Sequence, residues 1–392
     1  MAAAAAAAAV PVRLARAQAR PVRIGFAISE TGAYSVGAGI TQIPNYILWR
    51  DQVNARGGLL VAGEGRRPVE FVRYDDRSEI ETGIRLYERL ATVDRVDLIL
   101  PPWGTAMNFA VAPVVSEHEY PMIAPTLSSM QLQDFRLPYV YAILAQPDAQ
   151  MRALAGLLEY VREQNGYNRV AVLHVADLFG VEHYNELVPR LQSAGFEIVL
   201  DRSYPLGVSD LSDVLRGARS SGADIVIGLS YPPDTNLIVN QLSSIGFNPP
   251  VLYTAVGTAF PAFRDNFGAN SEGVMGVGAW NPKVPYPGAR EYFEAHVSHL
   301  DREPDRWASA SAYASLQILE QAVAEVGLDR RRIKEYIDSN EFQTVIGPVR
   351  FVDGVNVVTP GMVGQWQNGE FEVIWPREHA TAEPLVPKPA WR

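Results

Sequence analysis

Four aromatic residues lie in short segments that follow predicted strands. They are Tyr34, Trp103, Phe179 and Tyr231. In an open α/β sheet, ligands bind beyond the carboxyl ends of the strands, where loops and helix N-termini meet. Rings that line a closing cleft remove a large apolar area of a ligand from water. The pattern predicts a site for an apolar or ring-bearing ligand, while any one ring can instead pack the edge of its lobe.

Two of the segments that follow predicted strands carry small or hydroxyl-bearing residues. Gly104 and Thr105 follow one predicted strand, and Thr126, Leu127 and Ser128 follow the next. Serine and threonine in such places first of all cap helices by accepting hydrogen bonds from free amide groups. The same amides and the helix dipole also favour an anion. We therefore expect a ligand carboxylate to be bound there, and a capping residue can serve as a ligand group as well.

Sequence motifs of common enzymes are absent. The chain has no Gly-x-Ser-x-Gly elbow, no His-Glu-x-x-His, no phosphate-binding Gly-x-x-x-x-Gly-Lys-Ser/Thr and no dinucleotide glycine spacing. His296 and His299 lie at i,i+3 and could chelate weakly, but an exposed amphipathic helix is the favoured explanation of the pair. Asp75 and Asp76 are interpreted as capping side chains rather than acid/base or metal groups. We predict no catalytic residue, no metal ion and no cofactor.

The elements that would position these residues form two similar series of alternating strands and helices. Short β-branched runs alternate with stretches of helical period, which predicts an α/β fold with parallel sheets covered by helices on both faces. The predicted strands of the first series are 22–28, 69–74, 96–100 and 121–124, and those of the second are 170–175, 197–204, 223–228 and 251–253. Each series is expected to form one doubly wound lobe.

Three crossings between the lobes are predicted, near Ala145, Val277 and Gly347. The glycine-rich run 273–278 favours a crossing segment over a packed strand. The predicted lobes are 20–144 with 279–346 and 145–278 with 347–376, followed by an extended C-terminal tail, 377–392. Three such hinge crossovers allow a closing motion about one axis, which is the kind of motion that ligand-gated closure requires.

Length and composition agree with two soluble domains of ordinary size. The chain has 392 residues, which is more than one hydrophobic core normally accommodates. Of these residues, 47% are hydrophobic and 20% charged. The formal net charge is -10, which disfavours a phosphate-backbone partner, so we expect no nucleic acid. Cysteine is absent, which excludes disulfides, thiolate metal sites and cysteine nucleophiles.

The N-terminus resembles an export signal without its basic beginning. Residues 2–10 form an apolar run, and Ala17-Gln18-Ala19 has the small-x-small pattern of a cleavage site before Arg20. No lysine or arginine precedes the run, and Arg13 and Arg16 lie inside the cleavage region. The alternative is a low-complexity alanine leader with no targeting role.

Nearly the whole of residues 20–392 resembles the type I periplasmic solute-binding proteins of ABC importers, specifically the leucine/isoleucine/valine-binding group. The features that carry the resemblance are, in chain order, Ser29-x-Thr31-Gly32, Val53-Asn54-Ala55-Arg56-Gly57-Gly58, Tyr74-Asp75-Asp76, Pro113-Val114, Pro121-Met122-Ile123-Ala124-Pro125, Phe179-Gly180, Gly195, Ser209-Asp210-Leu211, Tyr313-Ala314, and Ile346-Gly347-Pro348 to Gln365-Trp366. Each motif is weak by itself, and their shared order and spacing are fairly specific.

The resemblance implies an exported periplasmic protein, expected to be a monomer, that binds a small molecule and delivers it to a membrane ABC permease. It implies that the ligand carboxylate is held near Thr105 and Ser128, with the ligand side chain against rings at Tyr34, Trp103 and Tyr231. The resemblance also implies a tyrosine after the first strand of the second lobe, and this chain has Phe179 at that position.

The family's acidic residue for the ligand's α-ammonium group falls at Val256. Asp177, Asp234 or Glu30 would have to replace it, because a buried unpaired ammonium group costs several kcal/mol. The expected ligand is therefore a hydrophobic or branched-chain amino acid, or a related carboxylate or amide without an amine.

Two other classes remain open at this point. A ligand-sensing receptor or an amide-responsive regulator has the same fold, although a cytoplasmic regulator would lack an export signal and a repressor would carry a DNA-binding headpiece. An enzyme is the less favoured alternative, because its motifs are missing.

Overall fold

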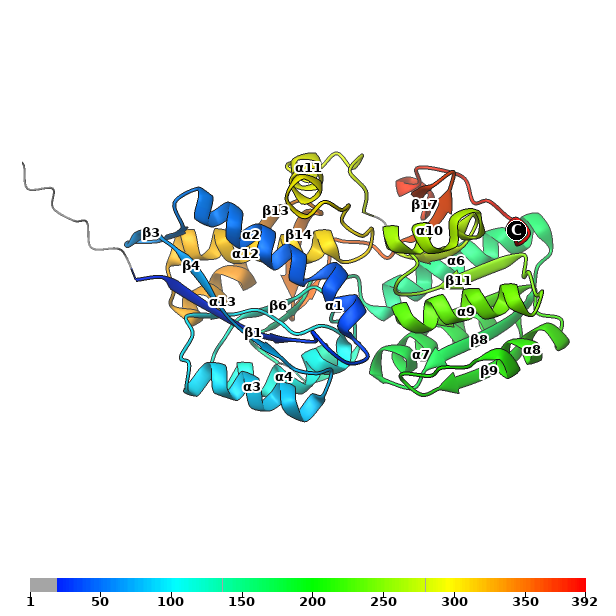
Figure 1. Ribbon diagram of the computed structural model, residues 1–392, viewed down its shortest axis with the longest axis horizontal. Helices are drawn as coiled ribbons and strands as arrows, with labels where there is room; N and C mark the ends of the chain where they lie inside the picture. Colours follow the sequence, from blue (N-terminus) through cyan, green and yellow to red (C-terminus); the bar gives the residue numbers. More distant parts are fainter. Residues whose placement is uncertain (1–19, 136, 279) are drawn as a thin grey trace, which may run out of the picture.

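The computed structural model describes residues 20–135, 137–278 and 280–392 and contains two α/β lobes side by side (Figure 1). In the first lobe, β1 (Val22–Ile28) pairs in parallel with β4 (Val69–Asp75) and β5 (Leu98–Ile99). A second sheet of this lobe joins β6 (Met122–Ala124) and β7 (Val140–Ala142) in parallel. Three strands from late in the chain complete it, namely β15 (Val355–Asn356), β14 (Gly347–Val352) and β13 (Glu341–Thr344). A separate hairpin pairs β2 (Leu59–Val61) with β3 (Gly65–Arg67).

The second lobe has one sheet with the strand order β17-β16-β12-β11-β10-β8-β9. Its bounds are β8 (Arg169–Val175), β9 (Glu197–Tyr204), β10 (Ile225–Leu229), β11 (Val251–Thr254), β12 (Met275–Val277), β16 (Val363–Gln367) and β17 (Glu370–Trp375). The strands from β9 to β12 are parallel to their neighbours, and β16 and β17 are added antiparallel at one edge. The predicted α/β fold with parallel sheets is confirmed.

Helices cover the sheets of both lobes (Figure 1). Those of the first lobe are α1 (Ser35–Thr41), α2 (Ile43–Ala55), α3 (Ile80–Thr92), α4 (Thr105–Glu117), α5 (Gln131–Phe135), α11 (Ala289–Leu300), α12 (Ser309–Val326) and α13 (Arg330–Ser339). Those of the second are α6 (Pro147–Asn165), α7 (Leu178–Ser193), α8 (Ser212–Ser220), α9 (Pro232–Ser244) and α10 (Pro261–Phe267), with short 3-10 turns η1 (Gly268–Ser271) and η2 (Arg377–His379). Among the described residues no helix is both long and apolar enough to span a bilayer.

The chain passes between the lobes three times. The first passage lies between β7 and α6, and the second between β12 and α11. The third lies between β15 and β16, which is later than the predicted position near Gly347. Gly347 instead begins β14, which forms a hairpin with β13 and remains in the first lobe. Its φ of 90° is a conformation that glycine adopts readily, and it suits the tight turn of this hairpin.

One other segment differs from its predicted role, and the predicted C-terminal tail packs on the second lobe. The glycine-rich run before the second passage contains β12, a buried strand of the second sheet rather than a loose crossing segment. A Cβ on Gly276 would lie 2.5 Å from the Thr258 Cβ, so glycine permits close packing at this point. The C-terminal tail is attached to the second lobe, because Leu385 N–H donates to Gln365 Oε1 (2.8 Å) and Trp391 Nε1 to the Phe247 carbonyl (2.8 Å). The leader predicted for residues 1–19 lies outside the described residues.

Candidate functional site

The aromatic residues predicted from both lobes come together at the junction of the lobes. Ring centroids are 5.6 Å apart for Tyr34 and Trp103, 5.5 Å for Tyr34 and Tyr231, 5.5 Å for Trp103 and Tyr231, and 5.1 Å for Phe179 and Tyr231. Their exposures are only 4%, 0%, 5% and 2% for Tyr34, Trp103, Phe179 and Tyr231. These four residues and Trp307, whose ring is 6.2 Å from Trp103, are called the interlobe cluster below. Its rings fill the space between the lobes at this point.

Tyr34 is positioned by the loop that follows β1. The Asp76 carboxylate accepts hydrogen bonds from Ser29 Oγ (2.6 Å) and from the Ser78 backbone N–H (2.8 Å). Ser78 Oγ then accepts one from the Tyr34 backbone N–H (3.0 Å). Asp75 accepts bonds from the Thr31 hydroxyl and nearby backbone amides. The acidic pair therefore orders the loop, as its capping interpretation predicts.

Trp103 is positioned by its contact with α1. Its Nε1 donates to Thr41 Oγ1 (2.9 Å), and the ring lies so close to Gly37 that a Cβ there would be 2.2 Å from the Trp103 Cζ2 atom. Glycine at position 37 therefore allows the indole to lie flat against the helix. The arrangement fixes the orientation of a ring that contacts both Tyr34 and Tyr231.

Trp307 was not among the predicted site residues. The buried Asp305 carboxylate accepts hydrogen bonds from the backbone N–H groups of Trp307 (2.7 Å), Ala308 (2.8 Å) and Ser309 (3.0 Å). This carboxylate organises the turn before α12 and directs the indole toward Trp103. An aspartate that precedes a helical pattern is a capping signal, but it does not reveal that the ring two positions later contacts Trp103.

Asp177 provides the carboxylate of the interlobe cluster. Its Oδ2 accepts hydrogen bonds from Tyr231 Oη (2.7 Å) and Tyr34 Oη (3.4 Å), and its Oδ1 accepts the Gly180 backbone N–H (3.0 Å) as the N-cap of α7. Burial raises the pKa of Asp177, and the bonds from Gly180, Tyr231 and Tyr34 offset only part of the shift. One residue of each lobe is thus bonded to the same carboxylate.

The predicted hydroxyl and amide groups are buried and bonded to one another. Gly104, with φ of 91°, is the N-cap of α4, so Thr105 is the first helical residue rather than the cap. Thr105 Oγ1 and the Ser128 backbone lie 3.3 Å apart, and the Thr126 hydroxyl accepts the Gly104 N–H (3.0 Å). Leu127 is fully buried in the apolar core beneath this region. These residues form the first-lobe wall of the junction.

A second carboxylate links the lobes beside this wall. Glu182 of α7 accepts hydrogen bonds from Ser129 Oγ (2.9 Å), Met130 N–H (2.9 Å) and Gln131 Nε2 (2.8 Å). Gln150 of α6 also approaches the first lobe, with its Nε2 3.3 Å from Ser128 Oγ. Ser128, predicted to receive a ligand carboxylate, is therefore the direct neighbour of Ser129, which already binds a carboxylate of the other lobe.

The other acidic residues suggested for an ammonium group are occupied elsewhere. Val256, the position where the resemblance implies an acidic residue, is fully buried, and its carbonyl accepts a hydrogen bond from the Thr235 hydroxyl (2.7 Å). Asp234 accepts Tyr204 Oη (2.7 Å) and the Tyr231 N–H (2.9 Å), and Glu30 pairs with Arg73 (2.6 Å). Of the three, Asp177 is the one that accepts hydrogen bonds from side chains of the interlobe cluster, those of Tyr34 and Tyr231.

The histidine pair does not form a chelate. His296 is buried and its Nδ1 donates to the Arg302 carbonyl (2.8 Å), whereas the exposed His299 lies 3.0 Å from Asp51 Oδ2. Burial lowers the pKa of His296 to about 4, so its ring is neutral near pH 7. The two rings thus have separate structural partners.

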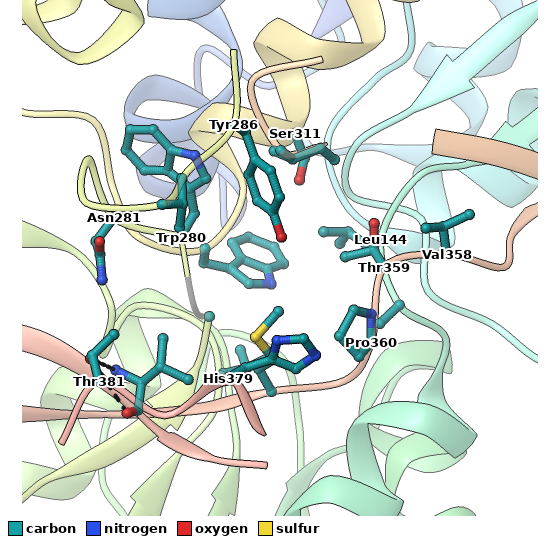
Figure 2. Close-up of a pocket in the computed structure, with 18 of the residues that line it drawn as sticks. Leu144, Trp280, Asn281, Tyr286, Ser311, Val358, Thr359, Pro360, His379 and Thr381 are labelled. Atoms are coloured by element: carbon teal, nitrogen blue, oxygen red, sulfur yellow. Dashed lines mark hydrogen bonds between the residues drawn. The ribbon is translucent and has the colours of Figure 1, made fainter. Parts of the chain in front are cut away.

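A cavity of about 660 Å³ adjoins the interlobe cluster. Leu144 of the first passage, Trp280 of the second and Pro360 of the third line it, and Trp307 belongs to both the cavity lining and the cluster. Figure 2 shows the Tyr286 side chain pointing into the space between Trp280 and Leu144. This cavity was not predicted, because residues that are distant in the sequence form its walls.

Comparisons with known proteins agree with this architecture. A family model described as a periplasmic binding protein matches residues 21–370. The Leu/Ile/Val-binding protein homolog 7 of Brucella abortus (strain 2308) is 25% identical over 356 residues, covering 86% of this chain and 87% of that protein.

Solved structures show the same fold. The leucine binding protein LivK of Thermotoga maritima MSB8 has a TM-score of 0.76 at 22% identity, covering 90% of this chain and 97% of that one. The branched-chain amino acid transporter substrate binding protein LivJ of Streptococcus pneumoniae, solved with isoleucine, has a TM-score of 0.77 at 22% identity, covering 91% and 100%.

Gly37→Ala should destabilise the protein by displacing Trp103. We expect the free energy of unfolding to fall by about 1–3 kcal/mol, the usual cost of overpacking, as measured by chemical denaturation. Gly39→Ala in the same helix is the control, because a Cβ there meets nothing within 4 Å, and alanine should be neutral or stabilising by up to about 1 kcal/mol. Equal losses for both variants would contradict the proposed close contact.

Asp177→Asn should change stability in a pH-dependent way. Because the pKa of Asp177 is raised in the folded state, the folded protein binds this proton more tightly than the unfolded chain, and the buried charge reduces stability above the folded pKa. The penalty disappears as the pH falls through that pKa. Asparagine keeps one accepting oxygen, so it loses either the Gly180 bond or the tyrosine bonds at every pH. Calorimetry should therefore show that the Tm of Asp177→Asn relative to wild type is higher at about pH 8 than at about pH 4. The exposed Asp213→Asn is the control, and a pH-independent difference for Asp177→Asn would contradict the assignment.

Proposed function

The chain belongs to the periplasmic binding protein family, and from this premise we propose that it is the substrate-binding component of an ABC importer. It captures a small amphipathic organic solute between its lobes, either a hydrophobic amino acid or a related carboxylate or amide, and delivers it to a membrane permease. The family assignment confirms the resemblance predicted from the sequence, within the branched-chain amino acid group. Proteins of this family and fold are substrate-binding proteins rather than enzymes.

The convergence of predicted site residues from both lobes is the observation that carries the proposal. Tyr34 and Trp103 come from the first lobe, and Phe179 and Tyr231 from the second, yet their rings are in mutual contact. Tyr34 and Tyr231 share the Asp177 carboxylate. A junction made from side chains of both lobes is complete only when the lobes are closed.

Closure converts solute binding into a signal for the permease. A solute that contacts both lobes has a higher affinity for the closed form than for the open form, so it shifts the population toward closure. The three passages supply the hinge. The permease then recognises the closed surface, which places the working protein outside the cytoplasmic membrane, in the periplasm. A monomer suffices for this role, because both halves of the junction belong to one chain.

Removing a ring of the interlobe cluster should weaken solute binding. Native mass spectrometry of the purified protein and a thermal-shift screen of aliphatic and aromatic amino acids and acids would first identify a solute. Trp103→Ala and Tyr231→Ala should each then raise the Kd of that solute at least tenfold. Truncating a buried ring loses about 1.5–3 kcal/mol of favourable apolar burial. Calorimetric titration provides the measurement.

Tyr160→Ala is the matched control, because Tyr160 stacks on Trp375 in a separate aromatic pair at 5.8 Å. Its Kd should stay within about twofold of wild type, well under the tenfold change that 1.4 kcal/mol gives. Unchanged affinity in both cluster variants, with folding intact by circular dichroism, would show that the cluster takes no part in binding.

A further inference from the structure

The cavity beside the interlobe cluster has the position of a solute chamber. The cluster rings are packed against one another, whereas the adjoining cavity has a volume of about 660 Å³, within the range of about 300–1,000 Å³ typical of small-molecule sites. Trp307 forms part of both. Space for a solute therefore exists next to the cluster rather than within it.

The walls of the cavity are mainly apolar and aromatic. The rings of Trp280, Tyr286 and Trp307 line it together with aliphatic side chains such as Leu144 and Met362. Trp280 is held in place because its Nε1 donates to the Val345 carbonyl (2.9 Å). Several fixed rings around one space favour an apolar, ring-bearing body on the solute.

Four polar groups at the cavity lack a hydrogen-bond partner within the described parts of the chain. They are Tyr286 Oη, Trp307 Nε1, Ser311 Oγ and Asn281 Nδ2. Asn281 and Ser311 are nevertheless buried, with exposures of 4% and 6%. Indole and amide nitrogens only donate, and the hydroxyls can donate as well. Donors that line the wall of a ligand site are complemented by acceptors on the ligand, so the cavity favours a solute with carboxylate or amide oxygens.

The charged side chains around the cavity do not favour an ammonium group. Among its described lining residues the acidic one is Glu378, which is exposed. Lys283 and His379 also lie at the cavity, and Lys283 pairs with Glu372 at 3.1 Å while keeping 60% of its side chain exposed. A buried ammonium group would lack a carboxylate partner there, at a cost of several kcal/mol in the general case.

All three passages between the lobes contribute to the lining, through Leu144, Trp280 and Pro360. Other parts of the lining come from the first lobe, as with Ser311, and from the second, as with Val373. Closing or opening the lobes must therefore change the shape of the cavity. A solute inside it would contact both lobes and the hinge at once, which gives it the differential affinity that closure requires.

We propose that this cavity is the solute-binding chamber of the protein and that it takes an apolar, preferably aromatic, carboxylate or amide without an α-ammonium group. The inference rests on the proposed solute-binding function. It assigns the solute to the hinge side of the junction, with the interlobe cluster acting as the closing wall.

Calorimetric titration with 3-phenylpropanoate, benzoate, benzamide, L-phenylalanine and L-leucine tests the chemical class. 3-Phenylpropanoate and L-phenylalanine differ only in the α-ammonium group, so the acid should bind at least tenfold more tightly, and benzoate or benzamide should bind more tightly than L-leucine. Preference for either amino acid over the acids and the amide would overturn the assignment of class.

Variants within the cavity test the place of binding. Ser311→Leu fills the space and should raise the Kd for 3-phenylpropanoate more than tenfold. Tyr286→Phe removes a hydroxyl that has no partner in the described chain and should raise it about threefold to tenfold, since one net hydrogen bond corresponds to that range. Glu325→Leu, at an exposed position of the same helix, is the control for added bulk and should bind as wild type does.

The outcomes separate this inference from the proposed function. If a solute binds and Ser311→Leu leaves its Kd unchanged while Trp103→Ala raises it, the chamber is wrong and the solute-binding function stands. If neither the five probes nor any compound of the wider screen binds, both proposals fail. A crystal structure with 3-phenylpropanoate between Trp280 and Trp307 would support the chamber directly.

Discussion

The contact of aromatic rings from both lobes around one buried carboxylate determines how the two halves of this protein meet. Each ring gains free energy by leaving water, about 25 cal/mol for every Å² of apolar surface. The Asp177 carboxylate works in the opposite direction, because burial raises its pKa and disfavours its charge. The two tyrosine hydroxyls reduce that cost only when both lobes are present. The carboxylate therefore makes the junction specific, while the rings make it stable.

The three passages between the lobes restrict how the lobes approach each other. A single linker would hold two lobes together without fixing how they approach, whereas three passages restrict the motion to opening and closing. The late hairpin of β13 and β14 and the strand β15 return to the first lobe before the chain finally enters the second. Tail residues such as Leu385 then bind to the second sheet. The third passage is consequently anchored at both ends by sheet pairing, through β15 and β16.

Much of this arrangement could be predicted from the sequence, because local patterns determine it. Alternating β-branched and amphipathic runs indicate the parallel sheets, and the rule that loops at strand ends gather at one edge brings Tyr34, Trp103, Phe179 and Tyr231 together. The errors fall where local signals are ambiguous. The glycine before Pro348 marks a tight turn, but a turn signal does not tell a hairpin from a passage between lobes. Trp307 carries no such local signal, because its contact with Trp103 depends on the turn that Asp305 organises.

The cavity was out of reach of sequence reasoning for a further reason, since empty space is a property of tertiary packing. Its chemistry nevertheless agrees with an expectation from the sequence, that Val256 stands where the resemblance implies an acidic residue. A site for amino acids needs a carboxylate with free lone pairs facing the ammonium group. Asp177 already accepts bonds from Gly180, Tyr231 and Tyr34, and Glu182 accepts three from the loop of Ser129. Carboxylates committed to closing the lobes are poor partners for a solute that must enter and leave, and this favours a solute that brings no positive charge.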